Sequence, residues 1–251
     1  MHIYTRSEPF GVVGQVTSWN FPAWAAAWKL GPALAAGNCA VIKPSKATPL
    51  TTIRMAQLAA GVLPDGVVNV VTGPGSVTGT ALVEHDDVRK VSFTGSGDVR
   101  TAVMRAAAGR FAPVTLELGG KSPFVVFPDA DLDTAVEAVA DGIYYSTGEI
   151  CDAFSRALVH EDIYDEFVER FVAKSESYVL GDPLNEATTM GPLTTAEGFE
   201  NVTEYIGIGE REGATLETGG GRPDDPALAD GLFVEPTVFT GVDNDMRVAS
   251  E

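Results

Sequence analysis

Short apolar runs alternate with helix-like stretches over the first hundred residues of the chain. The runs, typical of buried strands, are residues 11–18, 39–43, 67–71 and 88–95. The stretches with helical periodicity are residues 23–36, 51–61 and about 77–85. We expect Pro32 at a kink or in a late first turn, and Gly61 as the residue that ends its helix. This order of strand and helix predicts parallel βαβ units.

A second region of similar pattern begins near Gly119. It contains predicted strands at 122–127 and 156–160, predicted helices at 131–147, 163–180 and 195–213, and predicted loops at 182–192 and 219–231. We therefore expect an α/β protein with two lobes, residues 1–118 and 119–251, and a cleft between them. The chain begins just before an apolar strand and stops at Glu251 without a closing element, so we expect both lobes to be incomplete.

The charge balance narrows the possible partners. Asp and Glu number 35 against 17 Lys and Arg, for a net charge of −18, and the acids are spread over the chain. Such a protein repels nucleic acid and anionic membrane surfaces. Dense negative charge is tolerable in a salt-rich cytoplasm, which predicts a halophilic source; an ordinary acidic protein is the alternative. No segment is long and apolar enough to span a membrane or to act as a signal core, so we expect a cytoplasmic protein.

The cysteines and histidines do not form a structural or metal-binding pattern. Two cysteines, Cys39 and Cys151, predict no disulfide framework, and the three histidines are scattered. We therefore expect no metal site.

Two residues stand out as candidate reactive groups. Glu117 lies between two leucines, where partial desolvation favours a general base near neutral pH. Cys151 follows a glycine turn that can expose its thiol as a nucleophile. Each feature alone has an ordinary structural explanation, because a lone cysteine is more often buried and a lone glutamate is more often salt-bridged.

Five ordered motifs together resemble the NAD(P)-dependent aldehyde dehydrogenase superfamily. They are Trp19-Asn20-Phe21-Pro22, Lys43-Pro44-Ser45, Phe93-Thr94-Gly95-Ser96, Leu116 to Lys121, and Gly148 to Cys151. The similarity runs from about residue 8 to residue 251. It implies an aldehyde dehydrogenase-like fold, with a parallel Rossmann-type cofactor lobe and an α/β catalytic lobe.

The resemblance implies the oxidation of a small-molecule aldehyde to a carboxylic acid. In that reaction Cys151 attacks the carbonyl carbon, and Asn20 donates a hydrogen bond to the resulting oxyanion. Hydride transfer to NAD or NADP leaves a thioester, and Glu117 activates the water that hydrolyses it.

The resemblance also implies a cofactor site. Lys43 would bind the adenosine ribose, Ser96 a phosphate, and Gly75 would lie near the pyrophosphate. The remaining residues expected at this site are Thr17, Trp19, Ser45, Lys46, Phe93, Thr94, Gly95, Leu118 and Gly119.

Some positions depart from the family pattern. Lys46 stands where the family often has an acid that disfavours a 2′-phosphate, so we favour tolerance of NADP beside NAD; a solvent-facing lysine with NAD still in use is the alternative. Glu149 replaces the usual glutamine and adds a negative charge near Cys151. The expected substrate pocket, formed by Trp28, Tyr145, Ile150 and Asp152, is roomy and partly polar.

Length is the largest departure, because family members extend further at both ends. Glu251 matches the first glutamate of a family motif whose second, ribose-binding glutamate falls after the last residue. The parent enzyme is expected to be a homodimer or homotetramer. Two alternatives stay open: a non-catalytic fragment, and a coenzyme-A-acylating semialdehyde dehydrogenase, against which the presence of Glu117 argues.

Overall fold

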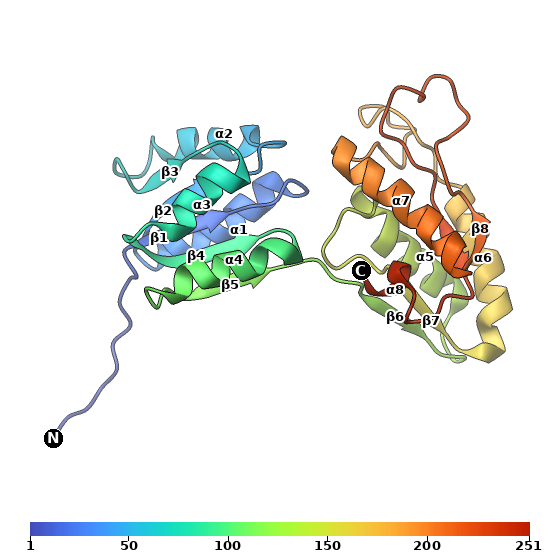
Figure 1. Ribbon diagram of the computed structural model, residues 1–251, viewed down its shortest axis with the longest axis horizontal. Helices are drawn as coiled ribbons and strands as arrows, with labels where there is room; N and C mark the ends of the chain where they lie inside the picture. The colour runs from blue at the N-terminus through green and yellow to red at the C-terminus, as the bar shows by residue number, and fades with distance from the viewer. The chain divides into compact units, whose positions relative to one another are not determined.

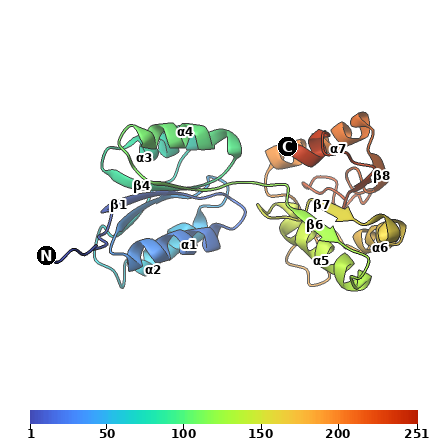
Figure 2. The same cartoon turned by 90° about the horizontal axis from the view of Figure 1, so that it is seen from below.

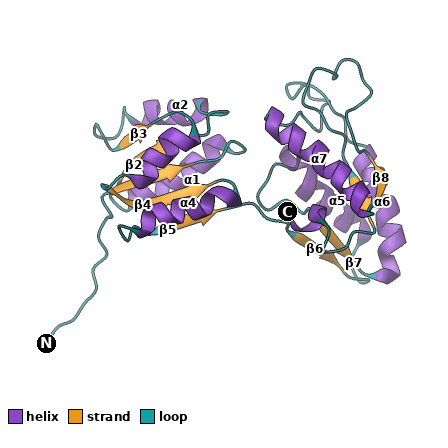
Figure 3. Cartoon of the chain, in the orientation of Figure 1, coloured by secondary structure: helices purple, strands orange, loops and turns teal.

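The computed structural model describes residues 1–251 and divides them into two compact units, Met1–Gly119 and Gly120–Glu251 (Figure 1). Strands and helices alternate in each unit, which confirms the expected α/β class (Figure 3). The division falls one residue after the boundary expected from the sequence. The assignment of cofactor binding and catalysis to separate lobes stays a prediction. No helix has both the length and the apolar character needed to cross a bilayer.

The first unit is built on a five-stranded parallel sheet with the order β3-β2-β1-β4-β5. Its strands are β1 (Val12–Val16), β2 (Cys39–Lys43), β3 (Val68–Val70), β4 (Val88–Thr94) and β5 (Val114–Glu117). Each neighbouring pair is parallel, as the βαβ pattern predicted. The strand order reverses between β1 and β4, and such a switch point is where open parallel sheets bind ligands beyond their carboxyl ends.

Helices cover both faces of this sheet (Figure 2). Helices α1 (Pro22–Ala35) and α2 (Leu50–Ala59) lie on one face, and α3 (Thr80–Glu84) and α4 (Gly97–Ala108) lie on the other. On the first face Leu30 packs against Val13 and Ile42. On the second face Val91 and Phe93 join an apolar cluster with Leu82 and Val103. A sheet buried on both faces explains why its strands are nearly continuous apolar runs.

Some local expectations for the first unit were wrong. Pro22 occupies the start of α1, and Pro32 lies inside the helix, so the first-turn alternative for Pro32 is wrong and the kink stays a prediction. Helix α2 ends at Ala60 in a right-handed conformation, so Gly61 does not end it through a left-handed cap. Helix α4 and strand β5 were not predicted. The signal of α4 is weak because only Val103 and Ala107 of its twelve residues are buried.

The second unit combines a parallel and an antiparallel strand pair with helices. Strand β6 (Pro123–Val126) pairs in parallel with β7 (Arg156–Val159), and β8 (Thr215–Thr218) pairs antiparallel with β9 (Val238–Thr240). The helices are α5 (Leu132–Tyr144), α6 (Tyr164–Glu176), α7 (Ala196–Glu212) and the short α8 (Arg247–Ser250). Helices α5 and α6 share an apolar cluster that includes Val139 and Phe167. The strands β8 and β9 and helix α8 were not predicted.

Helix α5 ends three residues earlier than predicted. It ends at Tyr144, and a 3-10 turn, Tyr145–Gly148, follows. Within this turn Ser146, Thr147 and Gly148 have φ values of 49°, 61° and 74°, which lie in the left-handed region. The last apolar position of the helical pattern is Ile143, and residues 144–147 contain neither glycine nor proline, so the sequence pattern did not mark where the helix ends. Helix α7, by contrast, begins after its N-cap Thr195 and ends at the left-handed Gly213, as predicted.

Candidate active site

The predicted cofactor residues of the first unit gather at the carboxyl edge of its parallel sheet. Lys43 ends β2, Thr94 ends β4, and Glu117 ends β5. The register places Val16 of β1 beside Lys43 and Phe93, and Thr94 beside Glu117. Parallel strands share one direction, so residues that are far apart in the sequence meet at this edge.

Two buried hydroxyl groups on this edge have no partner. Thr17, which follows β1, is only 3% exposed, and its Oγ1 forms no hydrogen bond. The Oγ1 of Thr94 at the end of β4 is likewise buried and unpaired. A buried polar atom without a partner costs about 1–3 kcal/mol. Because β1 and β4 flank the switch point, both residues lie at the sheet edge where open parallel sheets bind ligands.

The Lys43 side chain adds a cation to the same edge. It is 5% exposed, burial lowers the pKa of its ammonium group, and this group forms no ion pair or hydrogen bond within the chain. Its Cδ lies beside Gly79, the last residue of the π-helical turn Gly75–Gly79. A buried ammonium and two orphaned hydroxyls fit a ligand rich in hydroxyl and phosphate oxygens, such as a dinucleotide.

The N-terminus of helix α4 lies directly after Thr94. Ser96 is its N-cap residue, and the Ser96 hydroxyl makes no capping hydrogen bond. The first backbone N–H groups of a helix attract anions, so this position suits a phosphate. Gly95 donates its N–H to the Glu117 carbonyl oxygen at 3.1 Å, which ties this loop to the end of β5.

The remaining predicted cofactor residues of this unit have varied environments. The Ser45 hydroxyl accepts a hydrogen bond from the Ala47 N–H at 3.3 Å, and the Trp19 carbonyl accepts one from the Thr48 hydroxyl at 3.0 Å. Lys46 is exposed, which fits both a contact with a 2′-phosphate and a solvent-facing lysine, so the tolerance of NADP stays a prediction. Leu118 packs against the apolar cluster of the second sheet face, and Gly119 is exposed.

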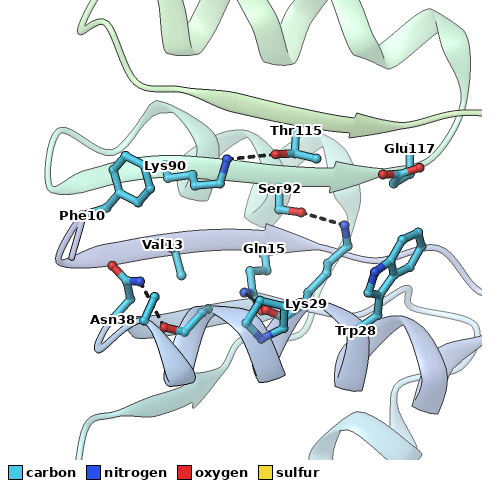
Figure 4. A pocket seen from close by; sticks show the side chains of 13 residues that line it. Phe10, Val13, Gln15, Trp28, Lys29, Asn38, Lys90, Ser92, Thr115 and Glu117 are labelled. Carbon is cyan, nitrogen blue, oxygen red and sulfur yellow. Dashed lines mark hydrogen bonds between the residues drawn. The ribbon is translucent and has the colours of Figure 1, made fainter. Parts of the chain in front are cut away.

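Glu117 lines a cavity of about 280 Å³ between α1 and the sheet (Figure 4). Trp28, a predicted substrate residue, lines the same cavity, and Lys29 beside it donates from Nζ to the Ser92 hydroxyl at 2.8 Å. The Gln15 amide lies deeper; its nitrogen donates to the Lys29 carbonyl at 2.8 Å, and its Oε1 has no partner. The structure therefore places a buried cation in the same cavity as the proposed base.

Sequence reasoning did not select Lys29. Burial lowers its pKa from 10.5 to about 8, although the negative charge of Glu117 acts in the opposite direction. One signal was available: Lys29 is the single charged residue in the apolar stretch 22–36, where an ionisable side chain has to be either solvated or functional.

Asn20 is held by a local contact. The Ser18 hydroxyl donates to its Oδ1 at 2.7 Å, which orients the amide group. Asn20 and Glu117 belong to the first unit, whereas Cys151 belongs to the second.

Cys151 is exposed and is a free thiol, as is the half-buried Cys39. It lies in the turn after Tyr145–Gly148. Its carbonyl oxygen would be 3.3 Å from a Cβ placed on Gly120, so a side chain at Gly120 would press on the backbone of the candidate nucleophile. Of the predicted substrate residues in this unit, Ile150 is half-buried, and Asp152 and Tyr145 are exposed. No group of three or more His, Cys, Asp or Glu side chains is placed to hold a metal ion.

Comparison with known proteins gives one consistent result. The sequence profile described as "Aldehyde dehydrogenase family" matches residues 1–251. The chain is 47% identical over 246 residues to betaine aldehyde dehydrogenase of Bacillus subtilis, covering 97% of this chain and 50% of that protein. It is 50% identical over 251 residues to aldehyde dehydrogenase 1A1 of Mesocricetus auratus, covering 99% of this chain and 49% of that protein.

A solved structure shows the same similarity. Betaine aldehyde dehydrogenase from Staphylococcus aureus, crystallised as a double mutant in complex with NAD+, superposes with a TM-score of 0.95 at 42% identity. That match covers 97% of this chain and 49% of the crystallised one. The chain thus spans about half the length of the curated relatives it matches.

Proposed function

Since the chain belongs to the aldehyde dehydrogenase family, we propose that it carries the reacting groups of an enzyme that oxidises a small aldehyde to a carboxylic acid with NAD(P)+. The observation that carries this proposal is the carboxyl edge of the parallel sheet. The unpaired hydroxyls of Thr17 and Thr94 and the buried Lys43 ammonium lie along this edge, and Thr94 pairs directly with Glu117.

The residues of this edge would bind and orient the cofactor. Lys43 would donate to ribose hydroxyls, and Thr17 and Thr94 would complete hydrogen bonds that they lack in the chain alone. Ser96 and the first turn of α4 would hold a phosphate. When bound, the nicotinamide supplies the hydride acceptor of the reaction. Lys46 extends the proposal to NADP, because a cation can accept a 2′-phosphate.

Cys151 would carry the covalent chemistry. Its exposed thiolate adds to the aldehyde carbonyl carbon, and the Asn20 amide donates to the oxygen that becomes negative. Loss of the hydride from that carbon leaves an acyl thioester on Cys151. Glu117 then removes a proton from water as the water oxygen attacks the thioester carbon, and the acid and the thiol are released.

Lys29 gives Glu117 an electrostatic neighbour. Its ammonium lines the same cavity as the Glu117 carboxylate, and the negative charge of Glu117 raises the pKa of Lys29 against the larger effect of burial. Relatives named betaine aldehyde dehydrogenase and aldehyde dehydrogenase 1A1 match this chain about equally well, so we propose only a small aldehyde as the substrate class.

The order of the steps can be tested with a burst experiment on a panel of aldehydes. We expect Cys151→Ala to abolish NADH formation. We expect Glu117→Gln to give one rapid turnover followed by a steady rate lowered by about 10²-fold, because the thioester then accumulates. Cys39→Ser is the matched control for the loss of a thiol and should retain both phases.

Three results would count against the proposal or point to an alternative. Full activity of the Cys151→Ala variant would show that Cys151 is not the nucleophile. Steady turnover that depends on coenzyme A would favour the acylating branch. Cofactor binding without any burst would indicate that the chain holds the groups but does not complete the reaction.

A further inference from the structure

The segment that carries Cys151 contains a strained turn. Ser146, Thr147 and Gly148 all have left-handed backbone conformations, and two of them bear a Cβ. A left-handed L-residue costs about 1–2 kcal/mol. Such a conformation persists only where the surrounding structure holds it. The contacts on either side of Cys151 therefore decide whether the thiol keeps one position.

After Cys151 the segment is fastened to α5. The Phe154 N–H donates to the Gly142 carbonyl oxygen at 3.1 Å, and the Phe154 ring lies against Phe124 with centroids 5.1 Å apart. A Cβ on Gly142 would stand 2.1 Å from the Phe154 ring, so only glycine allows this approach. This anchor lies three residues after the thiol.

Before Cys151 the segment is fastened to the start of α7. The Glu149 carboxylate accepts from the Thr194 hydroxyl at 2.7 Å and from the Thr194 N–H at 3.2 Å to each oxygen. Its Oε1 lies 3.5 Å from the Cβ position of Gly198, in the first turn of α7. A negative charge is stabilised at this end of a helix.

Burial raises the pKa of the Glu149 carboxylate above its usual value, and the hydrogen bonds from Thr194 offset only part of this effect. Its two oxygens share three contacts with Thr194, whereas the glutamine expected here from the family pattern has a single acceptor oxygen. The carboxylate can therefore accept hydrogen bonds from the Thr194 hydroxyl and the Thr194 N–H at the same time.

We propose that Glu149 is a positioning residue for Cys151, which clamps the left-handed turn to Thr194 and so fixes the thiol between two anchors. Only Ile150 separates the clamp from the thiol. The catalytic meaning of this inference rests on the proposed role of Cys151 as nucleophile; the clamp itself is a property of the second unit alone.

The test compares hydrogen exchange of backbone amides 146–155 among variants of the full chain. We expect Glu149→Ala to raise exchange in this segment by about tenfold, since it frees the strained turn. Glu149→Gln, which keeps one acceptor oxygen, should recover most of the protection. Thr194→Val keeps the N–H and removes the hydroxyl, so the increase in its exchange should be intermediate. If Glu149→Ala does not fold, Thr194→Val tests the same hydrogen bonds.

Thr195→Ala is the matched control. Thr195 caps α7 by accepting from the Gly198 N–H at 3.0 Å, and this bond is separate from the hydrogen bonds that Thr194 donates to Glu149. Its loss should destabilise the chain by about 1 kcal/mol and leave exchange at 146–155 unchanged. Equal increases in Thr195→Ala and Glu149→Ala would overturn the inference, as would unchanged exchange in Glu149→Ala.

A kinetic readout separates positioning from general stability. In Glu149→Ala the rate of the NADH burst should fall by about tenfold, whereas the KM for the cofactor, whose proposed binding residues lie in the other unit, should not change. A normal burst rate despite faster exchange would overturn the positioning role. A normal exchange pattern in the parent chain with no burst at all would instead count against the proposed function.

Discussion

Two threonines with buried, unpaired hydroxyls distinguish the carboxyl edge of the parallel sheet from an ordinary sheet edge. More than about 90% of buried polar groups in folded proteins are hydrogen-bonded. The hydroxyls of Thr17 and Thr94 are exceptions, and both residues lie at the switch point between β1 and β4. Each therefore represents a cost to the chain alone that a bound cofactor would remove.

This cost predicts a trade between stability and binding. Thr94→Val should stabilise the cofactor-free chain by about 1 kcal/mol, because an isosteric methyl needs no partner. The same change should weaken NAD binding severalfold, as measured by fluorescence titration. Thr52→Val is the contrasting control: Thr52 is fully buried with its hydroxyl on the Pro22 carbonyl, so its replacement should destabilise. Lower stability of the Thr94→Val variant would contradict the interpretation.

Lys29 makes a second prediction at this scale, in the dependence of stability on pH. Its pKa is about 8 in the folded chain and 10.5 when unfolded, so between these values the unfolded state binds more protons. The free energy of unfolding should therefore rise as the pH increases from about 8 to 10.5, by up to about 3 kcal/mol.

Urea titrations across this pH range give the measurement. Lys29→Met should reduce the rise, because the methionine side chain has no proton to lose, and the part that remains belongs to Lys43 and Lys121, whose pKa values burial also lowers. Lys46→Met, which changes an exposed lysine in the same unit, should retain it. An identical rise in the wild type and in Lys29→Met would assign the effect to other groups.

At the scale of elements, Arg110 joins three pieces of the first unit. Its guanidinium donates to the Val83 carbonyl in α3, to the Val88 carbonyl in β4 at 3.1 Å, and to the Ala106 carbonyl in α4 at 2.7 Å. One side chain thus fastens the two helices on that face to the strand between them. Helix α4 needs this support, because little of its surface is buried.

Removing the guanidinium should loosen this face. Arg110→Met should lower the free energy of unfolding by about 2–3 kcal/mol, since hydrogen bonds from a charged donor are lost and carbonyls are left partly unpaired. Arg105→Met, which changes an exposed arginine in α4, should change it by less than about 0.5 kcal/mol. Urea denaturation of both variants measures the difference. Equal effects would show that Arg110 does not hold α3, β4 and α4 together.

At the scale of the whole molecule, the net charge of −18 dominates. If the protein comes from a salt-rich cytoplasm, raising KCl from about 0.1 M to about 1 M should increase the unfolding midpoint in urea, because screening shortens the range of repulsion from about 10 Å to about 3 Å. The gain from screening should level off near that concentration, whereas a salting-out effect continues to grow. A midpoint that does not change with salt would favour an ordinary acidic protein.

The sequence by itself predicted most of the strands and helices and identified the candidate reacting groups. Apolar runs predicted four of the five parallel strands, because a strand buried on both faces is a continuous apolar run that local pattern reveals. The ordered motifs around Asn20, Glu117 and Cys151 predicted the family, which the match over residues 1–251 confirms. Their individual roles remain proposals.

Only the tertiary structure decided how individual side chains are paired and buried. The burial of Lys29 beside Ser92 joins residues 63 positions apart, and the clamp of Glu149 on Thr194 joins residues 45 apart. The left-handed turn at Ser146 is held by that clamp and by the packing of Phe154 against Gly142, although Ser146 belongs to the stretch that the sequence predicted as helix. Periodicity reports which face of an element is apolar, whereas a strained turn or a displaced pKa depends on distant neighbours that only packing brings together.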